Sequence, residues 1–148
     1  EYLRGLCQRN QFADGGFEVC GTRLQLSDIG VPVCAVACET DHIAAWAQSY
    51  RGAQKMTGAD RHFILAESGH VAGIINPPQR NKYGYYIQDS LVESPEDWQS
   101  SAVYTAGSWW PAWKDWLMLH SGKNIEPYKP KSPKGLDLYN APGQYVLK

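Results

Sequence analysis

The stretch VPVCAVACETDHIAAWAQSYRGAQKMTGADRHFILAESGH, residues 31–70, decides the fold. Residues 31–38 form an apolar run in which both alternating faces are hydrophobic, and residues 61–67 form a second short apolar run. Such runs are typical of strands in a parallel sheet that is covered on both faces. The sequence therefore predicts two buried strands here.

A helical pattern separates the two strands. Residues 44–56 carry Trp46, Tyr50, Ala53 and Met56 at helical spacing, which predicts one buried stripe. A strand, a helix and a strand within so short a span indicate a right-handed crossover, so the two strands are predicted to be parallel.

An acid and a histidine follow the two predicted strands. Asp41 stands just past the first strand, and His70 stands just past the second. Because the carboxyl ends of parallel strands meet at one edge of a sheet, both side chains are expected there. A carboxylate beside an imidazole holds one tautomer and stabilises the positive charge that forms when the ring takes a proton. Asp41 and His70 are therefore candidates for two members of a catalytic triad, although both residue types also end strands for purely structural reasons.

The nucleophile of such a triad is missing. The α/β-hydrolase fold places the acid and the histidine after successive late strands and carries the nucleophile upstream, on a Gly-x-Ser/Cys-x-Gly elbow. Cys7 has a glycine two residues before it but Arg9 two residues after it, and Cys20 falls in a predicted turn. This chain is therefore expected to be inactive alone. Its start at Glu1 instead of Met suggests a piece of a longer protein.

The rest of the chain predicts smaller elements around this unit. The expected elements are the end of a helix at 1–11, a hairpin at 17–19 and 22–26, a loop or irregular extended segment at 79–92, and helices that begin at Ser94 and Ser108, the second ending at Gly122. Residues 1–122 are predicted to be a portion of one α/β domain, and residues 123–148, with four prolines and scattered lysines, an extended tail.

Composition excludes several kinds of partner. The net charge is −1 and no basic face is visible, so neither nucleic acid nor an anionic membrane surface is an expected partner. No apolar stretch approaches the roughly 20 residues of a membrane span. The four cysteines include no Cys-x-x-Cys pair, which favours buried reduced thiols over a metal site. No metal or cofactor is predicted.

Several motifs resemble the C-terminal part of the polyhydroxyalkanoate synthases, most closely the class that polymerises short-chain 3-hydroxyacyl-CoA. They are TDHI at 40–43, SGHVAGIINPP at 68–78, SPEDW at 94–98, GSWWPAW at 107–113 and APGQYV at 141–146. The resemblance runs from about residue 17 to the end of the chain.

The resemblance implies an α/β-hydrolase core and a cysteine that carries the growing polyester as a thioester. His70 matches the family's general base, and Asp41 matches the acid that either orients this histidine or activates the 3-hydroxyl of the incoming monomer; both roles stay open. The implied partners are (R)-3-hydroxyacyl-CoA, the polyester chain and the remainder of the synthase, and the implied location is the cytoplasmic surface of polyester granules. The alternative is a truncated, non-catalytic module that binds granules or intact synthase.

Other conspicuous side chains have weaker claims to a function. His42 is expected to be a packing residue or a neighbour of the site, and His62 and His120 are expected to be structural. The tryptophans at 109–116 fall at helical spacing, which favours the core, although a granule-surface or homodimer contact is the competing interpretation.

Overall fold

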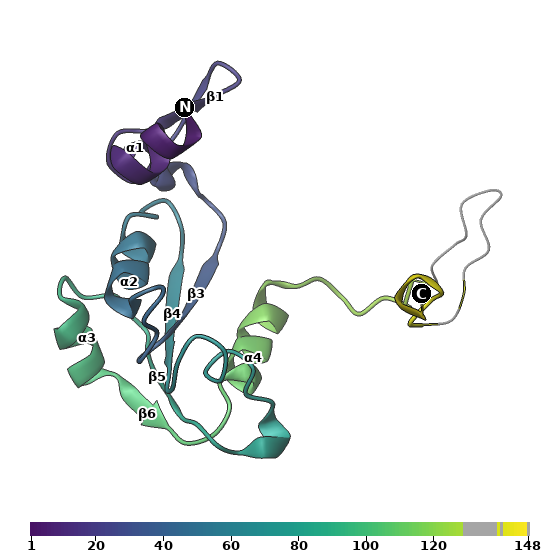
Figure 1. Ribbon diagram of the computed structural model, residues 1–148. Helices are drawn as coiled ribbons and strands as arrows, with labels where there is room; N and C mark the ends of the chain where they lie inside the picture. The colour runs from purple at the N-terminus through teal and green to yellow at the C-terminus, as the bar shows by residue number, and fades with distance from the viewer. Residues whose placement is uncertain (129–138, 140, 148) are drawn as a thin grey trace.

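The protein is described by a computed structural model for residues 1–128, 139 and 141–147. Its helices and strands are η1 (Leu3–Gln8), α1 (Gln11–Asp14), β1 (Phe17–Val19), β2 (Thr22–Leu24), η2 (Leu26–Asp28), β3 (Val33–Cys38), α2 (Trp46–Gln54), β4 (Arg61–Ala66), η3 (Pro78–Arg80), β5 (Tyr85–Gln88), α3 (Pro95–Ser101), β6 (Val103–Thr105), α4 (Trp110–His120) and η4 (Tyr145–Leu147). The chain is therefore a mixed α/β protein (Figure 1).

The strand–helix–strand unit predicted from residues 31–67 is confirmed. Strands β3 and β4 pair in parallel, with Val33 opposite Arg61 and Cys38 opposite Ala66, and α2 connects them. Within the described residues, β3 pairs with β4 alone and forms one edge of the sheet. Its first four residues are only half-buried.

The sheet extends beyond the parallel pair with two strands that the sequence did not predict. Its order is β3-β4-β5-β6, and both β5 and β6 are antiparallel to their neighbours. The expectation of a loop or irregular extended segment at 79–92 was therefore incomplete, since Tyr85–Gln88 forms β5 within it. Hydrogen bonds to β4 make this segment a strand, and the local sequence does not reveal that partner.

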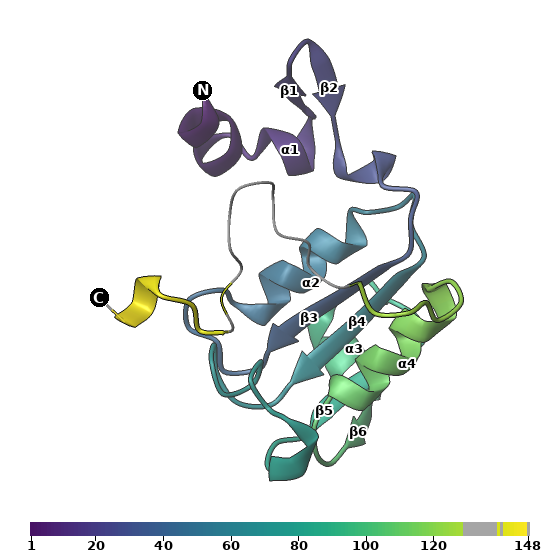
Figure 2. The same cartoon turned by 90° about the vertical axis from the view of Figure 1, so that its right-hand side faces the viewer.

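Helices cover both faces of the sheet (Figures 1 and 2). On one face Tyr50 and Ala53 of α2 and Trp98 of α3 form a core cluster with Phe63 and Leu65 of β4. On the other face a second cluster contains the side chains of Cys38, Ile64, Ala66, Tyr85 and Trp109, with the start of α4 packed against it. The sheet thus has a hydrophobic layer on each side, as the two apolar faces of its strands require.

Helix α4 differs from the expectation of a buried tryptophan face. Trp109, just before the helix, is 7% exposed, but none of the residues 110–120 is buried. Trp113, Met118 and Leu119 are 39%, 60% and 81% exposed. Only the first turn of the helix lies on the sheet, so the core interpretation holds for Trp109, holds in part for Trp110, which packs against the second cluster, and is wrong for the rest of the stripe.

The N-terminal segment lies at the end of the sheet where β3 and β4 begin (Figures 1 and 2). The predicted helix at 1–11 is in fact a π-helical turn, η1, followed by the short α1, with Asn10 in the left-handed conformation between them. The predicted hairpin is confirmed as β1 and β2. Lys55, the first residue after α2, and Asp14 form an ion pair of 2.7 Å that ties this segment to the sheet domain.

The predicted tail lies partly outside the described residues, at 129–138, 140 and 148. Residues 123–128 carry no helix or strand. Among the helices that the structure describes, none has the length and apolar character needed to cross a membrane.

Candidate functional site

Asp41 and His70 meet at the carboxyl ends of β3 and β4. Oδ2 of Asp41 lies 2.8 Å from Nδ1 of His70. The Asp41 side chain is 8% exposed, whereas that of His70 is 48% exposed. The carboxylate is therefore shielded by protein, and Nε2 of the half-exposed imidazole is the nitrogen left to exchange a proton with another group.

The turn that follows β3 holds the other oxygen of Asp41. Its Oδ1 accepts hydrogen bonds from the backbone N–H groups of Ile43, at 2.8 Å, and Ala44, at 2.9 Å. The hydrogen bond from Ala44, followed by that from His70, lowers the pKa of Asp41 to about 2. An ionised carboxylate can only accept, so Nδ1 of His70 must carry the proton that the pair shares.

The lowered pKa of Asp41 makes the stability of the chain depend on pH. The pKa of an aspartate in the unfolded chain is about 3.9, the reference value. Around and below this pH, the unfolded chain therefore binds more protons than the folded chain, in which Asp41 has the lower pKa. The stabilisation by ionised Asp41 is thus present above the reference value and is lost as the pH falls toward 2. We expect the urea midpoint to drop between about pH 5 and pH 2, and to drop less in Asp41→Asn. Equal pH dependence of both proteins in urea titrations would contradict this expectation.

Backbone hydrogen bonds join the two chain segments that lead to the site. Past the strand ends, the N–H of Glu39 donates to the carbonyl of Ala66 at 2.8 Å, and that of Thr40 donates to Ser68 at 3.1 Å. Ser68 has a φ of +72°, in the left-handed region that side chains other than glycine rarely occupy. This conformation turns the chain sharply away from the sheet two residues before His70.

Gly73 allows the turn that carries His70 to lie directly on the sheet. A Cβ at this position would stand 2.6 Å from Sγ of Cys38 and 2.7 Å from the carbonyl oxygen of Glu67. Trp109 also holds this turn, because its indole N–H donates to the carbonyl of Gly73 at 2.9 Å. Trp110 donates in the same way to Ile74 at 3.0 Å. Two tryptophans at the start of α4 thus fix the downstream end of this turn.

The cysteines that the sheet contains are unsuited to serve as the nucleophile. Burial raises the pKa of Cys34 to about 11, and burial together with the nearby charge of Asp41 raises the pKa of Cys38. Both thiols therefore stay protonated at neutral pH. Cys7 and Cys20 are exposed in the N-terminal segment. In the described part of the chain, Asp41 is the hydrogen-bond partner of His70, and no cysteine, serine or threonine bonds to it.

A cavity begins one residue after His70. It has a volume of about 210 Å³, and its walls are formed by Val71, Ala72, Ile75, Asn76, Arg80, Lys82 and Tyr83. Among the described residues, neither Arg80 nor Lys82 forms an ion pair. The cavity therefore combines apolar side chains with two positively charged ones, on the segment that follows the candidate base in the sequence.

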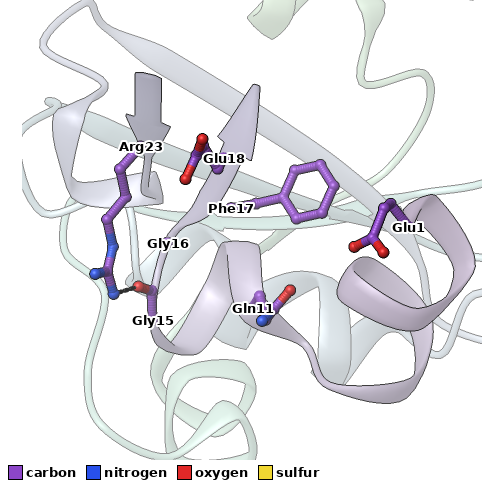
Figure 3. A pocket seen from close by; sticks show the side chains of 7 residues that line it. All are labelled: Glu1, Gln11, Gly15, Gly16, Phe17, Glu18 and Arg23. Carbon is purple, nitrogen blue, oxygen red and sulfur yellow. Dashed lines mark hydrogen bonds between the residues drawn. The ribbon is translucent and has the colours of Figure 1, made fainter. Parts of the chain in front are cut away.

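A larger cavity of about 610 Å³ lies elsewhere, in the N-terminal segment (Figure 3). Its walls are formed by Glu1, Gln11, Gly15, Gly16, Phe17, Glu18 and Arg23. The guanidinium of Arg23 donates to the carbonyl of Gly15 and so closes one side of it. The walls include no cysteine, serine or histidine, so this cavity lacks the thiol or hydroxyl nucleophile and the imidazole base of a catalytic triad.

Among the described residues, none of the remaining histidines is hydrogen-bonded to the Asp41–His70 pair. His42 is exposed beside Asp41, His62 lies within β4, and His120 ends α4 with its ring 4.7 Å from that of Trp116. Within residues 1–128, 139 and 141–147, no three His, Cys, Asp or Glu side chains gather where a metal ion could bind.

Sequence reasoning missed the residues that support the site. Trp109 and Trp110 were treated as core or surface residues, and Glu67 and Gly73 were not singled out. One signal was available, because Glu67 directly follows β4 just as Glu39 follows β3. The indole hydrogen bonds had no signal, since they join residues 36 positions apart.

The known proteins that are similar to this chain are all of one kind. The chain is 37% identical over 147 residues to the poly(3-hydroxyalkanoate) polymerase subunit PhaC of Cupriavidus necator, an alignment that covers 98% of the chain. The chain is a relative of the poly(3-hydroxyalkanoate) polymerases. It is also 33% identical over 147 residues to the PhaC subunit of Rhizobium etli and 42% identical over 137 residues to poly(3-hydroxyalkanoate) polymerase 2 of Ectopseudomonas oleovorans.

The polymerase relatives are much longer than this chain. It spans 25% of the Cupriavidus protein, 23% of the Rhizobium protein and 24% of the Ectopseudomonas protein. No protein-family model matches the chain. The predicted resemblance to the polyhydroxyalkanoate synthases is confirmed by these polymerases.

Proposed function

We propose that this chain is the C-terminal part of the catalytic domain of a polyhydroxyalkanoate synthase with an α/β-hydrolase fold. In this proposal residues 1–122 belong to that domain and residues 123–148 form its tail. The complete enzyme polymerises (R)-3-hydroxyacyl-CoA into polyester and releases CoA. The 2.8 Å contact between Asp41 and His70, at the carboxyl edge of two parallel strands, is the observation that carries the proposal.

In this mechanism a cysteine from the remainder of the synthase faces Nε2 of His70. The imidazole takes the thiol proton, the thiolate attacks the thioester carbonyl of the substrate, and CoA leaves as the protonated thiol. Asp41 holds Nδ1 and stabilises the imidazolium. Its short bond to His70 favours this orienting role over direct activation of the 3-hydroxyl, because the shared oxygen is already engaged.

Two further observations support a site completed by another chain segment. In the described residues neither Cys34 nor Cys38 is hydrogen-bonded to His70, and burial raises the pKa of both thiols, which supports a nucleophile from another segment. The free edge of β3 offers backbone groups to which a further strand can pair. A strand at that edge would run beside β3, which ends three residues before Asp41.

The cavity after His70 fits the proposed substrate class. Its apolar side, formed by Val71 and Ile75, suits an acyl chain, and Arg80 and Lys82 suit the phosphates of CoA. Substrate and base would then lie on one continuous segment.

A second candidate function rests on exposed apolar side chains of α4. Trp113, Met118 and Leu119 are all exposed on this helix, and exposed apolar side chains can mark a binding surface. In this alternative the chain is a non-catalytic module that docks on polyester granules, on intact synthase or on a second copy of itself. Either function would act in the cytoplasm, at the granule surface.

The substitution Asp41→Asn in the complete synthase separates the two functions. The asparagine oxygen can still accept from Ile43 and Ala44, but its amide then donates to Nδ1, and the proton of His70 moves to Nε2. The ring can no longer act as a base, so we expect CoA release to slow by about a hundredfold or more while granule association stays intact. Normal CoA release with impaired granule association would favour the binding module instead.

A further inference from the structure

Glu67 links the end of β4 to both antiparallel strands. It is the first residue after β4, and its backbone N–H donates to the carbonyl of Gly84 at 2.9 Å. Its carboxylate oxygen Oε2 accepts the N–H of Gly84 at 2.6 Å and the hydroxyl of Tyr104, on β6, at 3.2 Å. One side chain thus ties the start of the loop to β5 and β6.

The site that receives this carboxylate is closely fitted. Gly84 is buried, and a Cβ there would overlap the ring of Tyr104, so only glycine lets the phenol lie across the backbone at this point. Partial desolvation, followed by the charge of Glu67, raises the pKa of Tyr104. The phenol therefore stays protonated and remains a donor to the carboxylate.

The loop that leaves Glu67 carries His70 three residues later. The carbonyl of Glu67 bounds the space at Gly73, in the same turn as His70. Downstream, Trp109 and Trp110 hold the carbonyls of Gly73 and Ile74. The turn is therefore fastened at both ends, with Glu67 as the upstream anchor.

We propose that Glu67 is a positioning residue that, through Gly84 and Tyr104, holds the His70 turn so that Nδ1 stays on Asp41. The expected effect on catalysis rests on the proposed function. The expected effect on the Asp41–His70 hydrogen bond rests only on the hydrogen bonds of Glu67. Removing the carboxylate would leave a buried N–H at Gly84 without a partner, and the upstream anchor would be lost. Glutamine keeps an acceptor oxygen at the same place and should keep the anchor.

Glu39 provides a matched control. It also follows a strand by one residue, but its carboxylate accepts from the side chain of Gln99, on α3, at 2.7 Å. It therefore shares the edge of the sheet and the negative charge with Glu67 without anchoring the turn of His70. Glu67→Ala, Glu67→Gln and Glu39→Ala form the test set.

The first readout is kinetic and uses the complete synthase. We expect Glu67→Ala to lower kcat by about tenfold to a hundredfold with KM little changed, because a misplaced base affects the transition state more than substrate binding. Glu67→Gln and Glu39→Ala should stay within about threefold of the parent. Unchanged kcat in Glu67→Ala, or an equal loss in Glu39→Ala, would overturn the proposal.

The second readout does not depend on activity. In the 148-residue chain labelled with ¹⁵N-histidine, the Nδ1–H resonance of His70 reports its hydrogen bond to Asp41. We expect this resonance in the parent, in Glu67→Gln and in Glu39→Ala, and its loss through exchange with water in Glu67→Ala at a temperature where that variant is still folded. If it persists in Glu67→Ala the positioning role is refuted, whatever the synthase assay shows. If the resonance disappears in Glu67→Ala while the complete synthase with His70→Gln stays active, the positioning role stands and the proposed function fails.

Discussion

Replacing His70 by Gln is expected to slow CoA release by the complete synthase about 10²–10⁴-fold, the contribution typical of a general base. The glutamine amide can still donate to Oδ2 of Asp41, which the imidazole now occupies at 2.8 Å, so the turn should keep its place. What is lost is the nitrogen that accepts a proton from the nucleophile. The rate of CoA release from a 3-hydroxyacyl-CoA at saturating substrate measures this loss directly.

His42→Gln is the matched control for this substitution. The same residue types are exchanged beside the same carboxylate, but His42 is exposed and has no hydrogen bond to Asp41 among the described residues. We expect its rate to stay within about threefold of the parent. If His70→Gln kept more than a tenth of the parent rate while the enzyme remained folded, His70 would not be the base.

Trp98→Ala is expected to cost the chain about 3–5 kcal/mol of unfolding free energy, the usual range for an aromatic residue removed from a core. Trp98 is fully buried, and its ring lies 5.2 Å from that of Phe63 and 5.5 Å from that of Tyr50. These three aromatic rings join α2, α3 and β4. Because domains of this size are stable by only about 5–15 kcal/mol, the loss should be visible as a large shift of the urea midpoint.

Trp98→Phe tests the reason for that loss. The indole N–H of Trp98 is buried and, within the described residues, has no hydrogen-bond partner. Phenylalanine keeps the aromatic contacts and removes this unpaired donor, so its cost should be clearly smaller than that of alanine. Leu119→Ala, at a position 81% exposed, should change the unfolding free energy by less than about 0.5 kcal/mol. Similar costs for the alanine and phenylalanine variants would show that ring contacts do not hold α3 in place.

The part of the fold that sequence reasoning predicted is the part with local, repeated patterns. The two apolar runs and the helical stripe between them determine one crossover unit, and its geometry alone requires Asp41 and His70 to share an edge. The helix start at Ser94 was also predictable, because a serine side chain can accept a backbone N–H of the first helical turn. In the structure it accepts the N–H of Asp97.

The elements that were missed depend on distant partners. Tyr85–Gln88 becomes β5 because it pairs with β4, some 20 residues away, and Val103–Thr105 becomes β6 with all three side chains exposed. A three-residue strand with no buried face has no alternation to detect. Gly84, whose N–H donates to the Glu67 carboxylate, was unpredictable for the same reason.

The edge position of β3 has a consequence for exchange of its amide protons with solvent. The N–H of Val33 donates to Asp60 and that of Glu39 donates to Ala66, so odd-numbered amides of this strand point into the sheet. The alternating amides of Cys34, Val36 and Cys38 then point to the free edge, where deuterium from the solvent can replace their protons. A strand added by the remainder of a synthase would protect these three alternate amides and leave the others as they were. The exchange of alternate backbone amide protons of β3 with deuterium would therefore show whether a further strand has paired with this sheet.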